Sequence, residues 1–231
     1  MNRYSPSKLK TFQSCPLQYK LQYVDKICIP QPITADTQFG SMIHKMAEIF
    51  DGTNKIDLIK LVKNYQLNEE FRGAIVPTLR NFFLFWEKYN KYPFKTEKGY
   101  DLKTDDLWLY GIVDRIITKA NDELIVVDYK TAKNENRDGH LFQMRIYNLM
   151  LSRLFNKEPK EVKCIIYYPR IHVENKYLFT NKEINNFEQE LKSLIQTIES
   201  NMEWTPRPGF HCKWCGYKDK HCPAKKKGNN P

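Results

Sequence analysis

The sequence predicts an α/β fold in which helices flank a mixed β-sheet. Three observations predict this class: apolar residues recur at helical spacing up to residue 91, apolar and polar residues alternate from 94 to 131, and helical and strand patterns then follow in turn. With 231 residues, the chain can bury one sizeable core. We expect one domain over 1–231, divided into a helical region 1–92, an α/β core 93–180, and a C-terminal helix with a Cys-rich tail 181–231.

The N-terminal region reads as a series of helices. Ser5 can cap a first helix and Pro6 fits its first turn, whereas Pro16 predicts a break just after Cys15. The aromatic run NFFLFWEKY indicates a helix packed on the core. Helices are therefore expected at 5–25, 37–51 (ending near Gly52), 55–66 and 69–91.

From residue 94 onward, the pattern changes to that of strands. Turn residues at Lys103–Asp105 and at Ala120-Asn121-Asp122 separate three strands of a meander. The run VKCIIYYP is apolar throughout, as in a buried strand. The expected elements are strands at 94–103, 106–119 and 122–131, a helix at 137–156, strands at 162–169 and 173–179, and a helix at 182–201.

Composition and charge narrow the function classes. The formal net charge of +10 favours anionic partners, nucleic acid foremost, although a role in solubility alone would also explain it. No apolar run is long enough to span a membrane, and the amino terminus has no secretory signal. We expect a cytoplasmic protein without a membrane partner, in which thiols stay reduced and clustered cysteines indicate metal ligands before disulfides.

Two carboxylates and a lysine stand out within the predicted strands. Asp128 and Lys130 share one strand face, with Tyr129 pointing away, and an antiparallel hairpin would bring Asp114 close to Asp128. Oxygen ligands of this kind suit Mg²⁺ or Mn²⁺, and a lysine beside them can neutralise charge during phosphodiester hydrolysis. In the structural alternative, Asp114 pairs with Arg115 or another base, and Asp128 and Lys130 lie on a solvated edge.

At these residues the chain resembles a known family, the PD-(D/E)XK nucleases of the RecB type. The resemblance rests on GIVDRI followed by VDYKT, on FGSMIHKMAE upstream, on Q-x-x-x-Y downstream, and on the opening YSPSKLKTFQSCPLQYKLQYV. These motifs occur in the order of the family and cover residues 4 to about 150. The chain departs from the family name in lacking a literal PD dipeptide, because Val113 precedes Asp114.

The resemblance implies a restriction-endonuclease-like core with a site for Mg²⁺ or Mn²⁺. It implies that His44, Asp114, Asp128 and the Tyr129 carbonyl hold the metal ion, and that Lys130 orients the attacking water. It further implies that Gln143 and Tyr147, on one helical face, place DNA or Lys130. The residues alone favour a structural role for His44 on its apolar helix face and for Glu97, a further candidate carboxylate.

Cysteines in the tail indicate a second metal site. Cys212, Cys215 and Cys222 lie within eleven residues of a turn-rich segment, and His211, His221 or Cys15 could complete a zinc site. The layout is also similar to that of the AddB-like and CRISPR-associated members of the family. That resemblance implies a [4Fe–4S] cluster held by Cys15, Cys212, Cys215 and Cys222, although the last gap is six residues where five is expected.

Taken together, the resemblance implies a metal-dependent DNA exonuclease that acts without sequence specificity on single strands or DNA ends. It would serve recombination, repair, phage DNA processing or CRISPR adaptation. Because the chain has no Walker A motif, any unwinding needs a helicase, recombination or CRISPR partner. The alternatives are a non-catalytic DNA-binding scaffold of the same fold and a zinc-bound RNA-processing nuclease.

Overall fold

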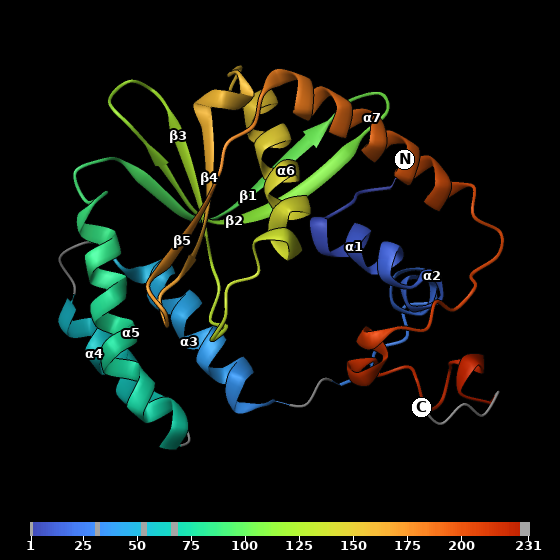
Figure 1. Cartoon of the computed structure of the whole chain (residues 1–231), viewed down its shortest axis with the longest axis horizontal. Coiled ribbons are helices and arrows are strands. Elements are labelled where there is room, and N and C mark those ends of the chain that lie inside the picture. The colour runs from blue at the N-terminus through green and yellow to red at the C-terminus, as the bar shows by residue number, and fades with distance from the viewer. Residues whose placement is uncertain (1, 31–32, 52–54, 66–68, 227–231) are drawn as a thin grey trace. The chain divides into compact units, whose positions relative to one another are not determined.

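The computed structural model describes residues 2–30, 33–51, 55–65 and 69–226 (Figure 1). The chain divides into two compact units, which are described separately. The sheet unit comprises Ile33–Leu102 and Tyr110–Glu188. The cysteine unit comprises Met1–Pro32, Lys103–Leu109 and Gln189–Pro231.

One mixed sheet has its five strands side by side in chain order, β1-β2-β3-β4-β5. The pairing of β2 with β3 is antiparallel, that of β3 with β4 parallel, and that of β4 with β5 antiparallel. The meander and the mixed sheet predicted from the sequence are therefore confirmed. The strands are β1 (Phe94–Lys103), β2 (Trp108–Thr118), β3 (Leu124–Tyr129), β4 (Val162–Tyr168) and β5 (Val173–Tyr177).

Helices α3, α4 and α5 pack together against one face of the sheet (Figure 1). Their apolar side chains form a core with alternate residues of β3 and β4, including Val127, Tyr129 and Tyr167. Within this core, the rings of Phe85 and Tyr167 stack with centroids 4.0 Å apart. The bounds are α3 (Ala35–Ile49), α4 (Lys55–Asn64) and α5 (Glu69–Glu87).

The opposite face of the sheet is covered by α6 (Arg137–Leu154). The Cys164 thiol of β4 lies 3.6 Å from the Met144 carbonyl of α6, and Cys164 pairs with Val126 of β3. Because side chains alternate along a strand, Asp128 shares this face with Val126 while Tyr129 belongs to the other. A short 3₁₀ helix (Pro159–Glu161) precedes β4.

Capping residues explain where the predicted helices begin. Thr34 forms a capping box with Thr37, so α3 begins at Ala35, two residues earlier than predicted. Asn136 accepts a hydrogen bond from the Gly139 backbone N–H at 2.9 Å and starts α6. The predicted helix end near Gly52 lies outside the described residues.

The cysteine unit begins with the predicted break in its first helix. The Ser5 hydroxyl accepts a hydrogen bond from the Lys8 backbone N–H at 3.2 Å and caps the first helix. That helix ends at Ser14, and a second helix begins at Pro16. Its elements are α1 (Pro6–Ser14), α2 (Pro16–Tyr19), a π-helical turn (Lys20–Val24), and 3₁₀ helices Phe210–Trp214 and Pro223–Lys226. The helix α7 (Asn181–Glu199) contributes to both units. Within the part of the chain that the structure describes, no helix is both long and apolar enough to cross a membrane.

Candidate metal centre

Three elements of the sheet unit bring a histidine and two carboxylates together. His44 comes from α3, Glu97 from β1 and Asp114 from β2, and their ligand atoms all lie within 4.8 Å of one another. The His44 Nδ1 atom is 3.3 Å from Asp114 Oδ2, and the Tyr129 backbone N–H donates to that same oxygen at 2.8 Å. Asp114 is 7% exposed, so its orientation is fixed by these neighbours.

Asp128 lies at the end of β3, with each of its oxygens facing a different partner. Lys130 Nζ is 2.5 Å from Oδ2, and Gln143 Nε2 donates to Oδ1 at 2.7 Å. The predicted shared face of Asp128 and Lys130 is thus confirmed, with the Tyr129 ring among Phe82 and Phe85 on the other face. Oδ2 is buried and, among the described residues, has an ion pair but no aligned hydrogen-bond donor.

Gln143 and Tyr147 connect α6 to both carboxylate-bearing strands. Gln143 Nε2 also contacts the Tyr147 hydroxyl at 3.1 Å, and that hydroxyl donates to the Ile112 carbonyl of β2 at 2.7 Å. Gly111 makes room for this arrangement, because a Cβ there would come within 2.7 Å of the Tyr147 ring. The signal for Gly111 in the sequence is a glycine inside a strand, which indicates a close approach of this kind.

Of the partners that the structural alternative allows Asp114, Arg115 is wrong, whereas another base, His44, does lie beside it. Arg115 points to the other face of β2, where it is fully buried and its Nη2 donates to the carbonyls of Ala47 and Phe50. Its guanidinium also stacks over Trp86, 4.1 Å from the ring centroid. Arg115 thereby holds the end of the helix that carries His44. Alternation along the strand already separates Asp114 from Arg115, but the sequence could not show which helix the arginine reaches.

Glu97 reaches the site through an unusual backbone conformation. Its φ is 45°, in the left-handed region, in the middle of β1. The neighbouring negative charge of Asp114 adds to burial in raising the pKa of the Glu97 carboxyl. Since no glycine or turn residue marks this position, strand periodicity alone gave no sign that Glu97 belongs with His44 and Asp114.

The charges of the site are tightly coupled. Burial raises the pKa of Asp128 to about 6, while the Lys130 ammonium opposes that shift and Asp114 adds to it. A hydrogen bond to Asp114 raises the pKa of His44 against the effect of burial. Clustered carboxylates that favour protonation are also groups whose repulsion a divalent cation would relieve.

The four cysteines expected to bind a cluster all lie in the cysteine unit. No three of the described cysteine sulfurs lie within 4.8 Å of one another, so the structure does not gather them into a metal site. The pKa of Cys215 is raised by burial and then by the charges of Cys15, Cys212 and Cys222. Backbone N–H groups point at three of the sulfurs: Arg207 at Cys15 (3.4 Å), Gly209 at Cys212 (3.4 Å), and Tyr217 at Cys215.

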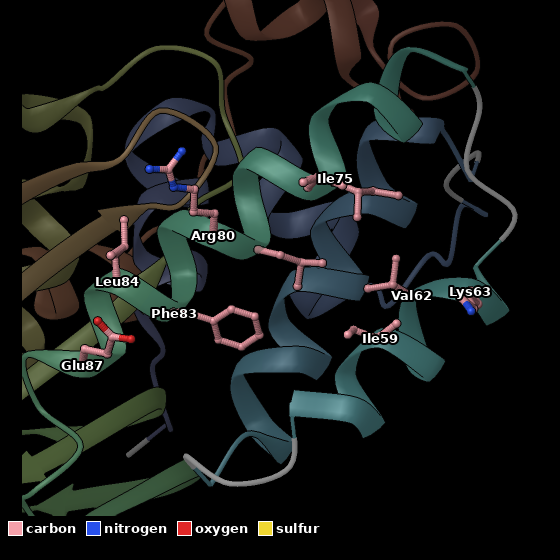
Figure 2. A pocket seen from close by; sticks show the side chains of 10 residues that line it. Ile59, Val62, Lys63, Ile75, Arg80, Phe83, Leu84 and Glu87 are labelled. Atoms are coloured by element: carbon pink, nitrogen blue, oxygen red, sulfur yellow. The ribbon is translucent and has the colours of Figure 1, made fainter.

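A separate apolar groove of about 610 Å³ runs between α4 and α5 (Figure 2). Aliphatic side chains and Phe83 line most of it, and its only described charges are those of Lys63, Arg80 and Glu87. It contains none of the residues of the metal centre. The groove therefore offers no carboxylate cluster and is not a second candidate for the same chemistry.

Fold and site together define an α/β protein with a carboxylate–histidine group that could hold a metal ion and with an adjoining lysine. The chain belongs to the PD-(D/E)XK nuclease superfamily, whose sequence profile matches residues 3–223. The family resemblance found in the sequence is thereby confirmed at the level of the superfamily.

Individual relatives are more distant. The chain is 26% identical over 117 residues to the CRISPR-associated exonuclease Cas4 of Francisella tularensis subsp. novicida (strain U112). That match covers 50% of this chain and 57% of the relative, so the chain spans little more than half of the relative's length. A solved structure described as a candidate exonuclease from Eubacterium rectale has a TM-score of 0.60 at 12% identity, over 98% of this chain and 89% of the other. The similarity to this solved structure is a similarity of fold alone.

Proposed function

We propose that the chain is a divalent-metal-dependent DNA exonuclease that acts on single strands or DNA ends without sequence specificity. The observation that carries this proposal is the convergence of His44, Asp114 and Asp128 beside Lys130. The whole chain, 1–231, acts as one nuclease domain in this proposal, with 1–92, 93–180 and 181–231 as its parts. The superfamily, the net charge of +10 and the exonuclease name of the relative support DNA as the substrate.

The residues present fit a Mg²⁺ or Mn²⁺ ion. His44, Asp114, Asp128 and the Tyr129 carbonyl would hold it. Glu97 is a further candidate ligand, because the group within 4.8 Å consists of His44, Glu97 and Asp114, without Asp128. Support comes from Asp128 Oδ2, a buried oxygen without an aligned donor among the described residues, and from the raised pKa of Asp128. When bound, the ion supplies Lewis-acid polarisation and charge neutralisation at the scissile phosphate.

The protein's own groups prepare the remaining parts of the reaction. Lys130 places a positive charge where negative charge develops on the phosphoryl oxygens and can orient the attacking water. Gln143 keeps Asp128 from rotating by donating to Oδ1, and Tyr147 holds Gln143 through its own bond to β2. This chain of bonds fixes the carboxylate to which Lys130 is paired.

In the cysteine unit we propose a [4Fe–4S] cluster bound by Cys15, Cys212, Cys215 and Cys222, with Zn²⁺ as the alternative. The electrostatic coupling of the four residues and the backbone N–H groups aimed at three sulfurs support a shared site for thiolates. Anaerobically purified protein should be brown and contain iron; a colourless protein with stoichiometric zinc would refute the cluster.

The test of the nuclease proposal uses end-labelled DNA in single- and double-stranded, linear and circular forms, with RNA of the same sequence alongside. With Mg²⁺ or Mn²⁺, the wild-type chain should shorten linear DNA from its ends and leave circles intact. Cleavage of RNA alone would favour an RNA-processing enzyme, and binding without any cleavage would favour a scaffold.

Matched variants compare the effect of substitutions in the site with that of the same residue types elsewhere on the surface. Asp128→Asn should lower the cleavage rate by about 10²–10³-fold because it removes a ligand of the ion. Lys130→Ala should lower it as much because it removes positive charge at the reacting phosphate. Asp122→Asn and Lys160→Ala change the same residue types in exposed ion pairs and should cleave at the wild-type rate. Equal activity in all four variants would end the proposal.

A further inference from the structure

Two aromatic side chains of the cysteine unit lie exposed, outside the core of that unit. Phe210 and Trp214 are 76% and 68% exposed, on the short helix Phe210–Trp214 between Gly209 and Cys215. Other aromatic residues of the same unit bury one another: Trp204 stacks on Tyr19 with centroids 5.8 Å apart and contacts Phe12 edge-on. The exposed pair is therefore set apart from the aromatic packing that stabilises the unit.

The two exposed rings form one contiguous surface with a cation beside it. Their centroids are 4.9 Å apart in an edge-to-face arrangement, and Lys213 Nζ lies 5.4 Å from the centre of the Phe210 ring. Lys218 Nζ contacts the Lys213 carbonyl at 3.3 Å, which brings a second cation to the same segment. Between Arg207 and Cys222 the sequence has four lysines and arginines and one acid, Asp219.

Both ends of the segment are held to the N-terminal part of the same unit, one to α1 and the other to the chain just after the π-helical turn. The Arg207 side chain donates to the Gln13 carbonyl, and the Tyr217 hydroxyl donates to the Ile27 carbonyl at 2.8 Å. Tyr217 is itself buried. The rings are thus presented on a fixed support, which lowers the entropic cost of ordering them when a ligand binds.

We propose that Phe210 and Trp214 form a stacking platform for unpaired nucleobases, with Lys213 and Lys218 contacting the adjoining phosphates. Aromatic faces interleaved with cations bind single strands without reading their sequence, because every base has a π-face. The inference rests on the proposed function and specifies how that function engages its substrate.

The test is equilibrium binding of the full-length chain, with EDTA present to prevent cleavage, to three fluorescein-labelled probes. These are an oligo-dT strand, an abasic strand of equal length, and a duplex. Trp214→Ala and Phe210→Ala should each weaken binding of the oligo-dT strand by about fivefold to a hundredfold. Binding of the abasic strand should not change, because it retains the phosphates but offers no base to stack.

Two further variants distinguish stacking from general hydrophobic contact. Trp214→Phe should retain most of the affinity for oligo-dT, whereas Trp214→Leu should bind as weakly as Trp214→Ala. Met202→Ala removes a 90% exposed apolar side chain of the same unit and should bind like the wild type. Unchanged iron or zinc content and unchanged circular dichroism establish that each variant is folded.

The failures of the two proposals can be told apart. If the wild type binds none of the probes and cleaves nothing, the proposed function is wrong. If the wild type binds oligo-dT but the alanine variants bind it equally well, or if they lose abasic and oligo-dT binding alike, the platform is wrong while the nuclease proposal stands. Wild-type affinity of Trp214→Leu for oligo-dT would also overturn the platform and would indicate general hydrophobic contact.

Discussion

The carboxylate centre of the sheet unit and the cysteine site of the cysteine unit differ in how they are held. Asp114 and Asp128 are fixed by side chains and a backbone amide, namely His44, Lys130, Gln143 and the Tyr129 N–H. The described cysteine sulfurs receive backbone N–H groups, but no three of them approach within 4.8 Å. The first site is therefore built by the fold, whereas the fold alone does not gather the described cysteine sulfurs into a site.

This difference implies different consequences for losing the bound group. The carboxylate centre should keep its geometry without the ion, because hydrogen bonds and a packed sheet support it. The cysteine site connects residues near both ends of the chain, so its bound group should contribute to folding itself. The following substitutions test this contrast.

The largest effect is expected at Cys15, the buried N-terminal member of the cysteine site. Cys15→Ser should remove the bound iron or zinc and open a loop of nearly the whole chain. By analogy with a disulfide of that span, unfolding free energy should fall by about 4–5 kcal/mol. Chemical denaturation with metal analysis measures both.

Cys28→Ser is the matched control, because Cys28 is exposed and belongs to the same unit. It should keep the metal content and the stability of the wild type. If Cys15→Ser behaves like this control, the cysteine site does not staple the chain.

A smaller loss of stability is expected for Arg115→Met, which tests how far the carboxylate centre is built by the fold. The substitution leaves the buried carbonyls of Ala47 and Phe50 without their donor, which costs about 2–3 kcal/mol. Because these carbonyls end the helix that carries His44, affinity for Mn²⁺ should fall as well. Denaturation and Mn²⁺ titration provide the two readings; reduced stability at unchanged Mn²⁺ affinity would assign Arg115 to the core alone.

Gly111→Ala should act on the reaction more than on the fold. The added methyl group would lie 2.7 Å from the Tyr147 ring, and overpacking of this kind costs about 1–3 kcal/mol. Displacing Tyr147 loosens Gln143 and thus Asp128, so kcat should fall by about tenfold with little change in KM. Wild-type kcat in this variant would show that the α6 side chains do not position Asp128.

The smallest effect is the pH dependence of stabilisation by Mg²⁺. Burial raises the pKa of Asp128 to about 6, above its unfolded value of about 3.9, so protonation stabilises the fold and this contribution is lost as pH rises through 6. A divalent cation can replace the proton above that pH. The rise in Tm on adding Mg²⁺ should therefore be larger at about pH 7.5 than at about pH 5. Below the pKa of Asp128 the ion must displace a proton, which costs about 1.4 kcal/mol of binding free energy for each pH unit. An equal rise at both pH values would exclude Asp128 from the ion's surroundings.

The sequence predicted the parts of the site that depend on periodicity. Alternation placed Asp128 and Lys130 on one face, and the helical spacing of four placed Gln143 beside Tyr147. Glu97 was weighed against a structural role, because its positive φ is a feature of tertiary structure that no local pattern signals. The partner of Arg115 depends on which helix crosses β2, and the spacing of the cysteine sulfurs depends on how distant segments meet; neither is encoded in local sequence.

The most direct test of the central claim is Mn²⁺ binding in the absence of DNA, measured by electron paramagnetic resonance. The account predicts a Mn²⁺ site in the wild type and in Asp122→Asn, and at least about tenfold weaker binding in Asp114→Asn and in His44→Ala. Thiolates do not favour Mn²⁺, so the cysteine site should not contribute to the signal. Unchanged affinity in Asp114→Asn and His44→Ala, with both variants folded, would contradict a metal centre at these residues.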